Sequence, residues 1–352
     1  MGPTVTAIVP TYNRPELLGA TIESALSQTY EDLVVLVGDN GGSPLNEGIV
    51  RGFDDPRVRY VRHEVSLGAQ NNWLTLIAMA DTPYVASLHD DDTWEPTFLE
   101  KTVPLLDQDP SVSVAFTDFW CVDDEGGHLD EHSRWLSDHS GRDRLPAGRF
   151  EGSYAEGLRM VALECAPQTA YAAVLRRQAV LDTEFPDEIS PIYDLWLAYQ
   201  VFRRGEGFAY VPERLTNYRV WGGSLTARGF GFGQDAVFAQ IVADNARVMP
   251  VVLEIEEEWA KGRFDRARNS LDEPSERIAA QRDFRLASPH LQGREYVVAQ
   301  LAGRSRIGWE AMRAARACVR AARTRAGGSL TAANGVREDL VRPSAAAEEL
   351  AS

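Results

Sequence analysis

The sequence predicts an α/β protein in which helices cover both faces of a mostly parallel sheet, followed by a helical C-terminal extension. Two observations predict this fold. Up to Phe116, short apolar runs alternate with segments whose apolar residues recur at helical spacing. Such βαβ alternation is typical of a parallel sheet that is buried on both faces and joined by right-handed crossovers. After Gly233 the spacing is almost entirely helical.

The elements of the sheet are expected in the following order. Apolar and β-branched runs predict strands at residues 5–9, 33–37, 58–61, 84–88 and 112–116. Between them, helical spacing predicts helices at residues 14–28, 45–53, 68–80 and 98–106. Pro15 suits the first turn of its helix, where a backbone N–H would have no partner within the helix.

The pattern changes after Phe116. Residues 118–149 are rich in Asp, Gly, His and Ser, and we expect loop and hairpin there. Further strands are expected at residues 169–175 and 208–211. Further helices are expected at residues 157–164, 178–181, 194–204, 235–258, 275–286, 293–301 and 308–325. Gly205 suits the end of one of these helices, because glycine tolerates the left-handed conformation of a C-terminal cap.

Composition narrows the class of protein. The chain has 352 residues and a formal net charge of −16, which argues against general nucleic-acid binding because nucleic acids select basic surfaces. Its three cysteines are widely spaced and odd in number, which fits a reducing cytoplasm and argues against a disulfide framework or a zinc site. We find no secretion signal and no apolar run long enough for a transmembrane helix. We therefore expect a cytoplasmic protein.

The most informative segment is His89-Asp90-Asp91-Asp92, which follows the apolar run at residues 84–88. The end of a buried strand would place these carboxylates at the carboxyl edge of the sheet, where open α/β folds bind ligands. Crowded carboxylates repel each other unless a cation lies between them, and oxygen ligands favour Mg²⁺ or Mn²⁺, which bridge to phosphates. The alternative is a solvated acidic turn that caps the next helix, with Asp92 or Thr93 as the N-cap.

Four segments, in this order, resemble the motifs of family 2 glycosyltransferases. They are Val9-Pro10-Thr11-Tyr12-Asn13-Arg14, Ser24-Ala25-Leu26-Ser27-Gln28-Thr29-Tyr30, Val37-Gly38-Asp39-Asn40 and Leu88-His89-Asp90-Asp91-Asp92. The resemblance covers roughly residues 4–225. It implies the GT-A fold, whose Rossmann-like sheet is mostly parallel. It also implies transfer of a sugar from a nucleotide sugar to a hydroxyl acceptor, in the biosynthesis of a polysaccharide, another glycan or a natural product.

The resemblance implies a donor site at the strand ends. Tyr12 would lie near the nucleobase, with UDP favoured over dTDP and GDP, and Asp39 or Asn40 would bind the base, although Asp39 also suits an ordinary turn. Asp90 would lie near the ribose. The implied donor-site residues are Pro10, Thr11, Tyr12, Arg14, Asp39, Asn40, Asn72 (or its neighbour Asn71), Asp90, Arg219 and Trp221. Asp91 or Asp92 would hold the divalent metal, Mn²⁺ or Mg²⁺, on the diphosphate.

The resemblance also implies a general base, Asp194, in the segment Tyr193-Asp194-Leu195-Trp196-Leu197. A sugar hydroxyl is a weak nucleophile, so a carboxylate must take its proton as it attacks the donor sugar. One base opposite a leaving diphosphate implies a single in-line displacement, and therefore inversion. Asp194 also suits a helix N-cap, and both roles can hold together. Asp187 and Glu188 are the nearest rivals for the base.

One segment departs from the family pattern. Family members often carry Tyr-Arg-x-His where this chain has Tyr218-Arg219-Val220-Trp221, and an indole cannot ligate a metal. The metal would then depend on fewer protein ligands, or Arg219 would carry more of the phosphate charge. A sugar could instead stack on Trp221. None of the six histidines shows a spacing that predicts a ligand.

From these motifs we divide the chain into four parts. Residues 1–110 would form the donor-binding half and residues 111–232 the acceptor-binding half, followed by a helical extension at 233–326 and a disordered tail at 327–352. Residues 304–325 carry seven arginines and one acidic residue. They would either contact an anionic membrane at its inner face, where a lipid-linked acceptor would lie, or pack on the catalytic domain or on a second subunit of a homodimer.

Two other functions stay open. A nucleotidyltransferase would use a similar sheet and metal, but the Gly-rich, basic loop that such enzymes carry after their first strand is replaced here by Pro10-Thr11-Tyr12-Asn13-Arg14. A catalytically inactive protein that binds sugar nucleotides is the second alternative, because Trp221 departs from the family pattern.

Overall fold

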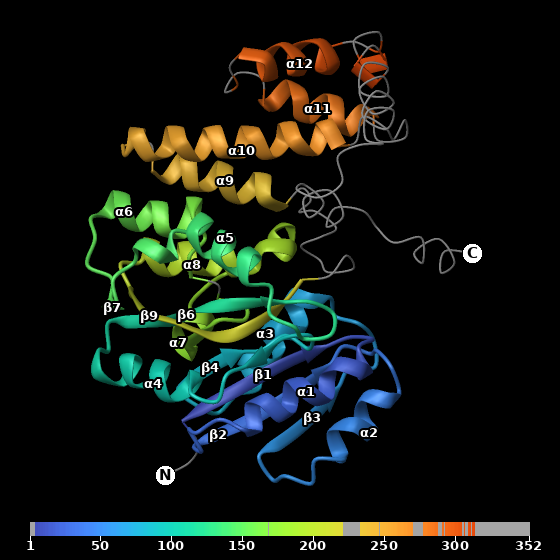
Figure 1. Cartoon of the computed structure of the whole chain (residues 1–352), viewed down its shortest axis with the longest axis vertical. Coiled ribbons are helices and arrows are strands. Elements are labelled where there is room, and N and C mark those ends of the chain that lie inside the picture. The colour runs from blue at the N-terminus through green and yellow to red at the C-terminus, as the bar shows by residue number, and fades with distance from the viewer. Residues whose placement is uncertain are drawn as a thin grey trace. The chain divides into compact units, whose positions relative to one another are not determined.

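The computed structural model of the chain describes residues 4–167, 169–220, 233–245, 247–269, 277–287, 291, 293–304, 306, 309–310 and 312–313. The chain divides into two compact units (Figure 1). The described part of the first unit comprises residues 4–167, 169–220 and 233–237, and that of the second comprises the described residues from Phe238 onward. The second unit overlaps the predicted helical extension, and the predicted tail lies outside the described residues.

A nine-stranded sheet forms the centre of the first unit, with the order β3-β2-β1-β4-β8-β6-β9-β5 and with β7 paired to β9 (Figure 1). Its strands are β1 Val5–Thr11, β2 Leu33–Asp39, β3 Val58–Arg62, β4 Tyr84–Ser87, β5 Thr93–Trp94, β6 Val112–Val122, β7 Gly148–Arg149, β8 Ala173–Arg176 and β9 Gly207–Arg219. The β1–β2, β1–β4, β2–β3 and β6–β9 pairs are parallel. The predicted α/β fold with a mostly parallel sheet is confirmed. The predicted halves, 1–110 and 111–232, share this one sheet.

Both faces of the first strands are buried, as continuous apolar runs predict. Val5, Ala7 and Val9 of β1 belong to a core cluster that also contains Leu18 and Ile22 from the helix after β1. The alternate residues of β1, Thr6 and Ile8, are buried as well. Because successive side chains of a strand point to opposite faces, β1 is covered on both sides.

The helices that alternate with these strands lie close to where the sequence predicts them. They are α1 Pro15–Leu26, α2 Leu45–Arg51, α3 Ala69–Met79 and α4 Phe98–Gln108. Pro15 is the first residue of α1. Proline is favoured at this position because it lacks the backbone N–H that would have no partner within the helix. Loops between these helices and strands carry the site described below.

The prediction of loop and hairpin at residues 118–149 holds only in part: residues 123–127 form a turn between Val122 and His128, which pair in an antiparallel bridge, but much of the segment is regular structure. β6 continues to Val122, and helix α5, Asp130–His139, follows it. The inward face of α5 is polar: Ser137 Oγ donates to Asp118, and the main-chain N–H of Cys121 donates to Ser133 Oγ. Because serines anchor α5, its inward face carries no apolar residues at helical spacing, and the hydrophobic pattern of the sequence could not predict this helix.

Several other elements differ from their predicted bounds. The helix predicted at 157–164 consists of α6 Tyr154–Leu158 and a π-helical turn, η2 Arg159–Leu163, and β8 is shorter than the predicted strand. The strand predicted at 208–211 extends to Arg219 as β9, and β5 was not predicted. The remaining elements of the first unit are the 3₁₀ segments η1 Arg142–Arg144 and η3 Asp187–Ile192 and the helices α7 Arg177–Leu181 and α8 Tyr193–Arg203.

The C-terminal helices are α9 Gly233–Asp244, α10 Met249–Asn269, α11 Arg277–Ala287 and α12 Gly293–Arg304. The single helix predicted at 235–258 is therefore two helices, and Pro250 falls in the first turn of α10, where proline is tolerated. Phe264, Phe284 and Trp309 are buried in the apolar core of the second unit. Most of the helix predicted at 308–325 lies outside the described residues.

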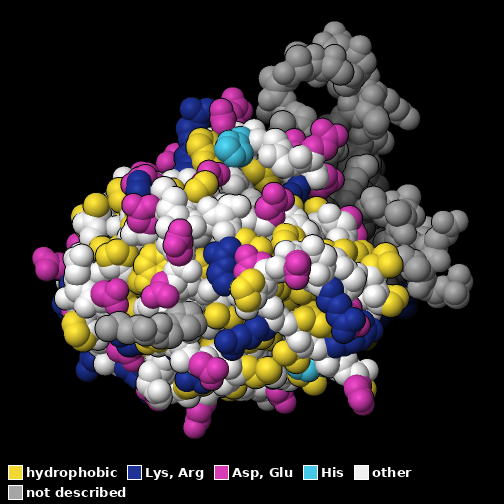
Figure 2. Space-filling view, turned by 90° about the horizontal axis from the view of Figure 1, so that it is seen from below, with side chains coloured by type: hydrophobic (Ala, Val, Ile, Leu, Met, Phe, Trp, Pro, Cys, Tyr) yellow, Lys and Arg dark blue, Asp and Glu magenta, His cyan; other side chains and the backbone are white. Residues whose placement is uncertain are grey.

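The surface carries charges of both signs. On the face drawn in Figure 2, acidic and basic side chains are interspersed with apolar and uncharged ones, as is ordinary for a solvated protein surface. Within the described part of the chain, no helix combines the length and the apolar character needed to cross a membrane.

Candidate active site

The site lies where three neighbouring strands end. β1 and β2 are parallel and pair from Val5 and Leu33 to Thr11 and Asp39, and β4 pairs with the other side of β1. The carboxyl ends of these strands therefore meet at one edge of the sheet, where open α/β folds bind ligands. Most of the residues predicted for the donor site belong to this edge: Pro10, Thr11, Tyr12, Arg14, Asp39, Asn40, Asp90, Asp91 and Asp92.

Asp90 is buried and held from the loop after β1. Its carboxylate accepts hydrogen bonds from Thr11 Oγ1 at 2.8 Å, from the main-chain N–H of Tyr12 at 3.1 Å and from Arg14 Nη1 at 3.0 Å. Burial raises the pKa of Asp90 to about 6, although the Arg14 guanidinium opposes the shift. Arg14 Nη1 also pairs with Asp91 and so supplies a positive charge between two of the crowded carboxylates.

Asp92 has one bound and one unbound carboxylate oxygen. Its Oδ1 accepts a hydrogen bond from the main-chain N–H of Arg219 at 2.9 Å. Its Oδ2 is buried and has no hydrogen-bond partner. Burial raises the pKa of Asp92 well above its usual range, and the neighbouring charge of Asp91 adds to the shift. An unpartnered buried carboxylate oxygen is costly, so this atom marks a place for a cation.

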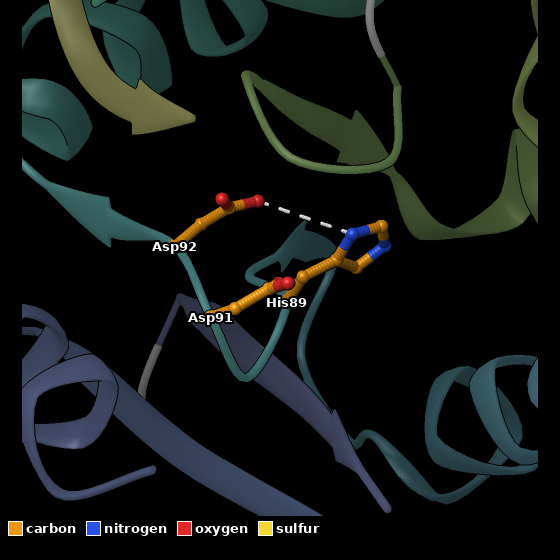
Figure 3. Close-up of side chains that lie close together, drawn as sticks. All are labelled: His89, Asp91 and Asp92. Carbon is orange, nitrogen blue, oxygen red and sulfur yellow. Dashed lines mark ion pairs between the residues drawn. The ribbon is translucent and has the colours of Figure 1, made fainter. Parts of the chain in front are cut away.

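His89 points toward the same place (Figure 3). Its Nδ1 lies 3.9 Å from Asp92 Oδ2, and one ligand atom from each of His89, Asp91 and Asp92 lies within 4.8 Å of the others. Burial lowers the pKa of His89, which favours the neutral imidazole that ligates metals. These residues fit a divalent cation. Sequence reasoning missed His89, although its position beside an acidic run at a strand end was a usable signal.

The interpretation of the acidic run as a helix cap is wrong. Thr93 and Trp94 form β5, and α4 begins only at Phe98, with Thr97 as its N-cap. The run is buried and is not a solvated turn, since Asp90, Asp91 and Asp92 are each less than a tenth exposed.

Asp39 and Asn40 shape the loop after β2. Asp39 is fully buried and accepts hydrogen bonds from the main-chain N–H of Gly42 at 2.8 Å and from the Tyr60 hydroxyl at 2.7 Å, which bears out its interpretation as a turn residue. Asn40 Oδ1 accepts from the main-chain N–H of Leu67. The amide nitrogen of Asn72 donates to the Gly38 carbonyl, so Asn72 supports the end of β2 from α3. Its neighbour Asn71 is exposed.

Tyr12 contrasts with the buried residues around it. Its side chain is 51% exposed although its main-chain N–H is held by Asp90. The loop after β1 thus presents an aromatic ring to solvent beside the acidic run, in a position from which a ring of a ligand could be stacked.

Asp194 lies in the first turn of α8, and the N-cap of that helix is Ile192, so the prediction that Asp194 is the N-cap is wrong. Burial raises the pKa of Asp194, opposed by the backbone N–H groups of Leu195 and of Asp194 itself. The preceding residue, Tyr193, has its hydroxyl 3.4 Å from His89 Nε2, which brings the start of α8 to the acidic run. Of the rivals, Asp187 is exposed on η3, and the side chain of Glu188 lies outside the described residues.

Arg219 closes the site from the end of β9. Its Nε donates to the Asp91 carbonyl at 3.0 Å, and its Nη1 donates to the carbonyls of Asp123 and Asp124 at 2.6 and 2.8 Å. The guanidinium therefore holds the acidic run against the loop after β6. Trp221 and the two glycines after it lie outside the described residues.

This arrangement combines a cluster of residues that fits a cation, an exposed aromatic ring, and a helix start, at Tyr193, that carries the next residue Asp194. Comparisons with known proteins identify the family and the fold. The family model described as "Glycosyl transferase family 2" matches residues 6–182, which is half of the chain. A curated relative from Escherichia coli, named UDP-Glc:alpha-D-GlcNAc-diphosphoundecaprenol beta-1,3-glucosyltransferase WfaP, is 24% identical over 235 residues, which make up 64% of this chain and 81% of the relative. Further curated relatives are matched over 15% to 52% of their own length.

Solved structures show the same fold. The S. aureus protein TarS, residues 1–349, in complex with UDP-GlcNAc has a TM-score of 0.59 and 13% identity, and the match covers 91% of this chain and 92% of that one. The mannosyltransferase PcManGT from Pyrobaculum calidifontis, in complex with GDP-Man and Mn²⁺, has a TM-score of 0.51 and 17% identity, with coverage of 91% and 81%.

Proposed function

The chain belongs to glycosyl transferase family 2, and on this premise we propose that it is an inverting hexosyltransferase that uses a nucleoside diphosphate sugar and a hydroxyl acceptor. The observation that carries the proposal is the cluster of His89, Asp91 and Asp92 at the end of β4, in which Asp92 Oδ2 is buried without a partner. A diphosphate placed at this edge of the sheet needs a cation, and the cluster offers the oxygens that hold one.

Donor binding divides among the strand-end loops. Asp91 and Asp92 would hold the divalent cation, which would supply positive charge to offset the negative charge of the departing diphosphate. Asp90 is fixed by three hydrogen bonds and retains acceptor capacity for a ribose hydroxyl, because a carboxylate accepts about four. Tyr12 stacks on the nucleobase, and Asp39 and Asn40 support the rim of the base site.

We favour UDP as the nucleotide of the donor. The name of the Escherichia coli relative contains UDP-Glc, and the S. aureus structure contains UDP-GlcNAc. The structure from Pyrobaculum calidifontis contains GDP-Man, which makes GDP the alternative.

Catalysis is assigned to Asp194 as the general base. The acceptor hydroxyl attacks the anomeric carbon of the donor sugar, and Asp194 takes the hydroxyl proton as the new C–O bond forms. The bond from the anomeric carbon to the diphosphate oxygen breaks on the opposite side, so the configuration at that carbon inverts. The raised pKa of Asp194 suits this role, because a more basic carboxylate is a stronger proton acceptor while it remains ionised near neutral pH.

The acceptor is proposed to be a lipid-linked glycan intermediate. The name of the Escherichia coli relative includes a diphosphoundecaprenol-linked sugar. Residues 304–325 carry seven arginines, whose charge would attract an anionic membrane, and flotation with anionic vesicles at low salt tests that part of the proposal.

The experiment for the proposed function is a screen of donor turnover. The full chain is incubated with Mn²⁺ and each of UDP-glucose, UDP-GlcNAc and GDP-mannose, with and without a lipid-linked acceptor, and the released nucleoside diphosphate is measured. Release from one donor, increased by the acceptor, supports the proposal. Pyrophosphate release from a nucleoside triphosphate would indicate a nucleotidyltransferase, and binding of UDP without turnover would indicate an inactive sugar-nucleotide-binding protein.

A further inference from the structure

We propose that His89 is a nitrogen ligand of the donor-site cation, that Tyr193 fixes its imidazole ring, and that this ligand makes the protein bind Mn²⁺ in preference to Mg²⁺. The inference rests on the proposed function, because it concerns the cation that would accompany the nucleotide.

The distances fit a shared ion better than a direct contact. His89 Nδ1 and Asp92 Oδ2 are 3.9 Å apart, which is too long for a hydrogen bond, and Oδ2 has no other hydrogen-bond partner. Two ligand atoms about 2.1 Å from one ion lie roughly 3.0 Å apart on adjacent sides of it and about 4.2 Å apart on opposite sides. The 3.9 Å gap falls within that range. The ligand atoms of the set with Asp91 all lie within 4.8 Å of one another, so binding one ion requires them to close by no more than about half an ångström.

The orientation of the ring is set from its other side. His89 Nε2 lies 3.4 Å from the hydroxyl of Tyr193, and the Tyr193 ring packs on the buried Trp73 at 5.0 Å between centroids. A neutral imidazole carries its proton on one nitrogen and a lone pair on the other. A proton on Nε2 that faces Tyr193 leaves the lone pair of Nδ1 directed at Asp92. A metal-binding histidine is held in the same way when its second nitrogen donates to a neighbouring acceptor.

The identity of the ligand decides the preferred cation. Mg²⁺ takes oxygen ligands and keeps several waters, whereas imidazole nitrogen suits transition metals. Trp221 stands where the related motif often has histidine, and it cannot supply a nitrogen ligand. His89 supplies one from the strand that carries the carboxylates.

Tyr193 has a second consequence, because it precedes Asp194 in the first turn of α8. The contact between Tyr193 and His89 therefore ties the helix of the general base to the cation site. Tyr193 acts as a positioning residue for His89, and its loss is expected to weaken Mn²⁺ binding about tenfold, as for other partners of metal ligands.

The test is electron paramagnetic resonance of Mn²⁺ bound to the full chain in the presence of UDP, with histidine labelled by ¹⁵N in a parallel sample. In the unaltered protein we expect a hyperfine coupling between Mn²⁺ and a nitrogen nucleus. This nitrogen coupling should change when histidine is labelled with ¹⁵N. It should disappear in His89→Ala and in His89→Asn, whose amide offers an oxygen near the position of Nδ1. In His89→Ala the Kd for Mn²⁺ should rise at least tenfold, whereas in His89→Asn the preference should shift toward Mg²⁺.

His139→Ala is the matched control, since His139 lies on α5 stacked on Trp135, and it should leave both the coupling and the Kd unchanged. Tyr193→Phe should raise the Kd for Mn²⁺ while keeping the coupling. If the unaltered protein binds Mn²⁺ and UDP but shows no histidine coupling, the role of His89 is overturned and the proposed function stays intact. This outcome is measured on the unaltered protein and does not depend on whether a variant folds. Failure of the unaltered protein to bind Mn²⁺ together with either UDP or GDP would overturn the proposed function, and the role of His89 with it.

Discussion

The main-chain N–H of Arg219 donates a 2.9 Å hydrogen bond to Oδ1 of Asp92, and this bond joins the end of β9 to the acidic run after β4. It fixes one oxygen of the carboxylate and leaves Oδ2 for a cation. Thr21 Oγ1 holds the carbonyl of Asp92 from α1. The side chain of Asp92 is therefore positioned before any ligand binds, which reduces the ordering cost of binding.

Replacing Arg14 should destabilise the metal-free protein. Arg14 pairs with Asp90 and Asp91, whose side chains are 8% and 10% exposed. Removing one partner of a fully buried pair costs about 3–5 kcal/mol, and since the Arg14 side chain is 23% exposed we expect a loss of about 2–3 kcal/mol in Arg14→Gln. Mn²⁺ should raise the Tm of this variant more than that of the unaltered protein. Arg51→Gln, at an exposed helical pair, should lose no more than about 0.5 kcal/mol.

Asp194→Asn should remove transfer while the fold persists. Loss of a general base costs about 10²- to 10⁴-fold in kcat. Asp187→Asn, at the exposed rival position on η3, is the matched control and should keep kcat within about twofold. Single-turnover transfer with a fixed donor and acceptor measures both. Full activity in Asp194→Asn together with loss in Asp187→Asn would reassign the base.

The activity should depend on pH through Asp194. Burial raises the pKa of its carboxyl, and the base works only when ionised, so kcat/KM should fall as the pH is lowered through this raised pKa. The measurement is a pH profile at saturating Mn²⁺ from about pH 3 to about pH 8. An acidic limb with an apparent pKa at or below the usual value of about 3.9 for aspartate would contradict the assignment.

The stability of the fold should fall as the pH rises through the range in which the activity rises. Between the ordinary pKa of aspartate and the raised pKa of Asp194, the native state binds more protons than the unfolded chain does, so this group lowers stability as the pH rises through that window. Asp194→Asn removes the effect. Its Tm at neutral pH is expected to equal or exceed that of the unaltered protein, and a large fall in Tm would show that the carboxylate supports the fold.

Tyr12 should contribute to nucleotide affinity through its ring. Stacking of a base on an aromatic side chain is worth about 1–3 kcal/mol, so Tyr12→Ala should raise the Kd for UDP between about fivefold and about 150-fold. Tyr12→Phe should keep the affinity within about twofold, because the side chain is half-exposed and its ring is retained. Calorimetric titration with UDP and Mn²⁺ separates the two variants. Equal affinities in Tyr12→Ala and the unaltered protein would remove Tyr12 from the base site.

The loops after β1 and β2 should tolerate no side chain at Gly42. A Cβ there would lie 2.6 Å from the backbone nitrogen of Asn13, so Gly42→Ala must push the two loops apart. We expect a loss of about 1–3 kcal/mol, with weaker UDP binding. Gly48→Ala, in α2 with no atom outside the helix's own backbone within 4 Å of the added Cβ, should instead gain up to about 1 kcal/mol. Chemical denaturation measures the free energy of unfolding of both variants. Equal changes in Gly42→Ala and Gly48→Ala would contradict the close approach of the two loops at Gly42.

The sequence could predict β1, β2 and β4 because buried strands leave continuous apolar runs, and the structure places these strands within a few residues of the predicted bounds. It could not predict α5, because Ser133 and Ser137 on its inward face bind Cys121 and Asp118 by hydrogen bonds and leave no apolar stripe. β9 extends past its predicted end through Pro212 and Glu213, which are exposed and interrupt the apolar run on which the predicted strand was based.

The acidic run could be predicted to bind a cation from its position after a strand, and the position of His89 beside that run was a signal of the same kind, but the direction of the His89 ring could not be predicted. The contribution of His89 depends on which way the ring turns, and that is fixed by Tyr193, which is 104 residues away in the chain. Asp194 was identified by resemblance, whereas its burial and the shift of its pKa follow from packing that no local pattern describes.

The central claim is that a divalent cation held by Asp92 anchors the diphosphate of the donor. The most direct measurement is calorimetric titration of the full chain with UDP, with Mn²⁺ and with a chelator, for the unaltered protein and for Asp92→Asn. We predict that Mn²⁺ lowers the Kd for UDP at least tenfold in the unaltered protein and has no effect in Asp92→Asn. An equal Kd with Mn²⁺ and with chelator in the unaltered protein, or an undiminished effect of Mn²⁺ in Asp92→Asn, would contradict it.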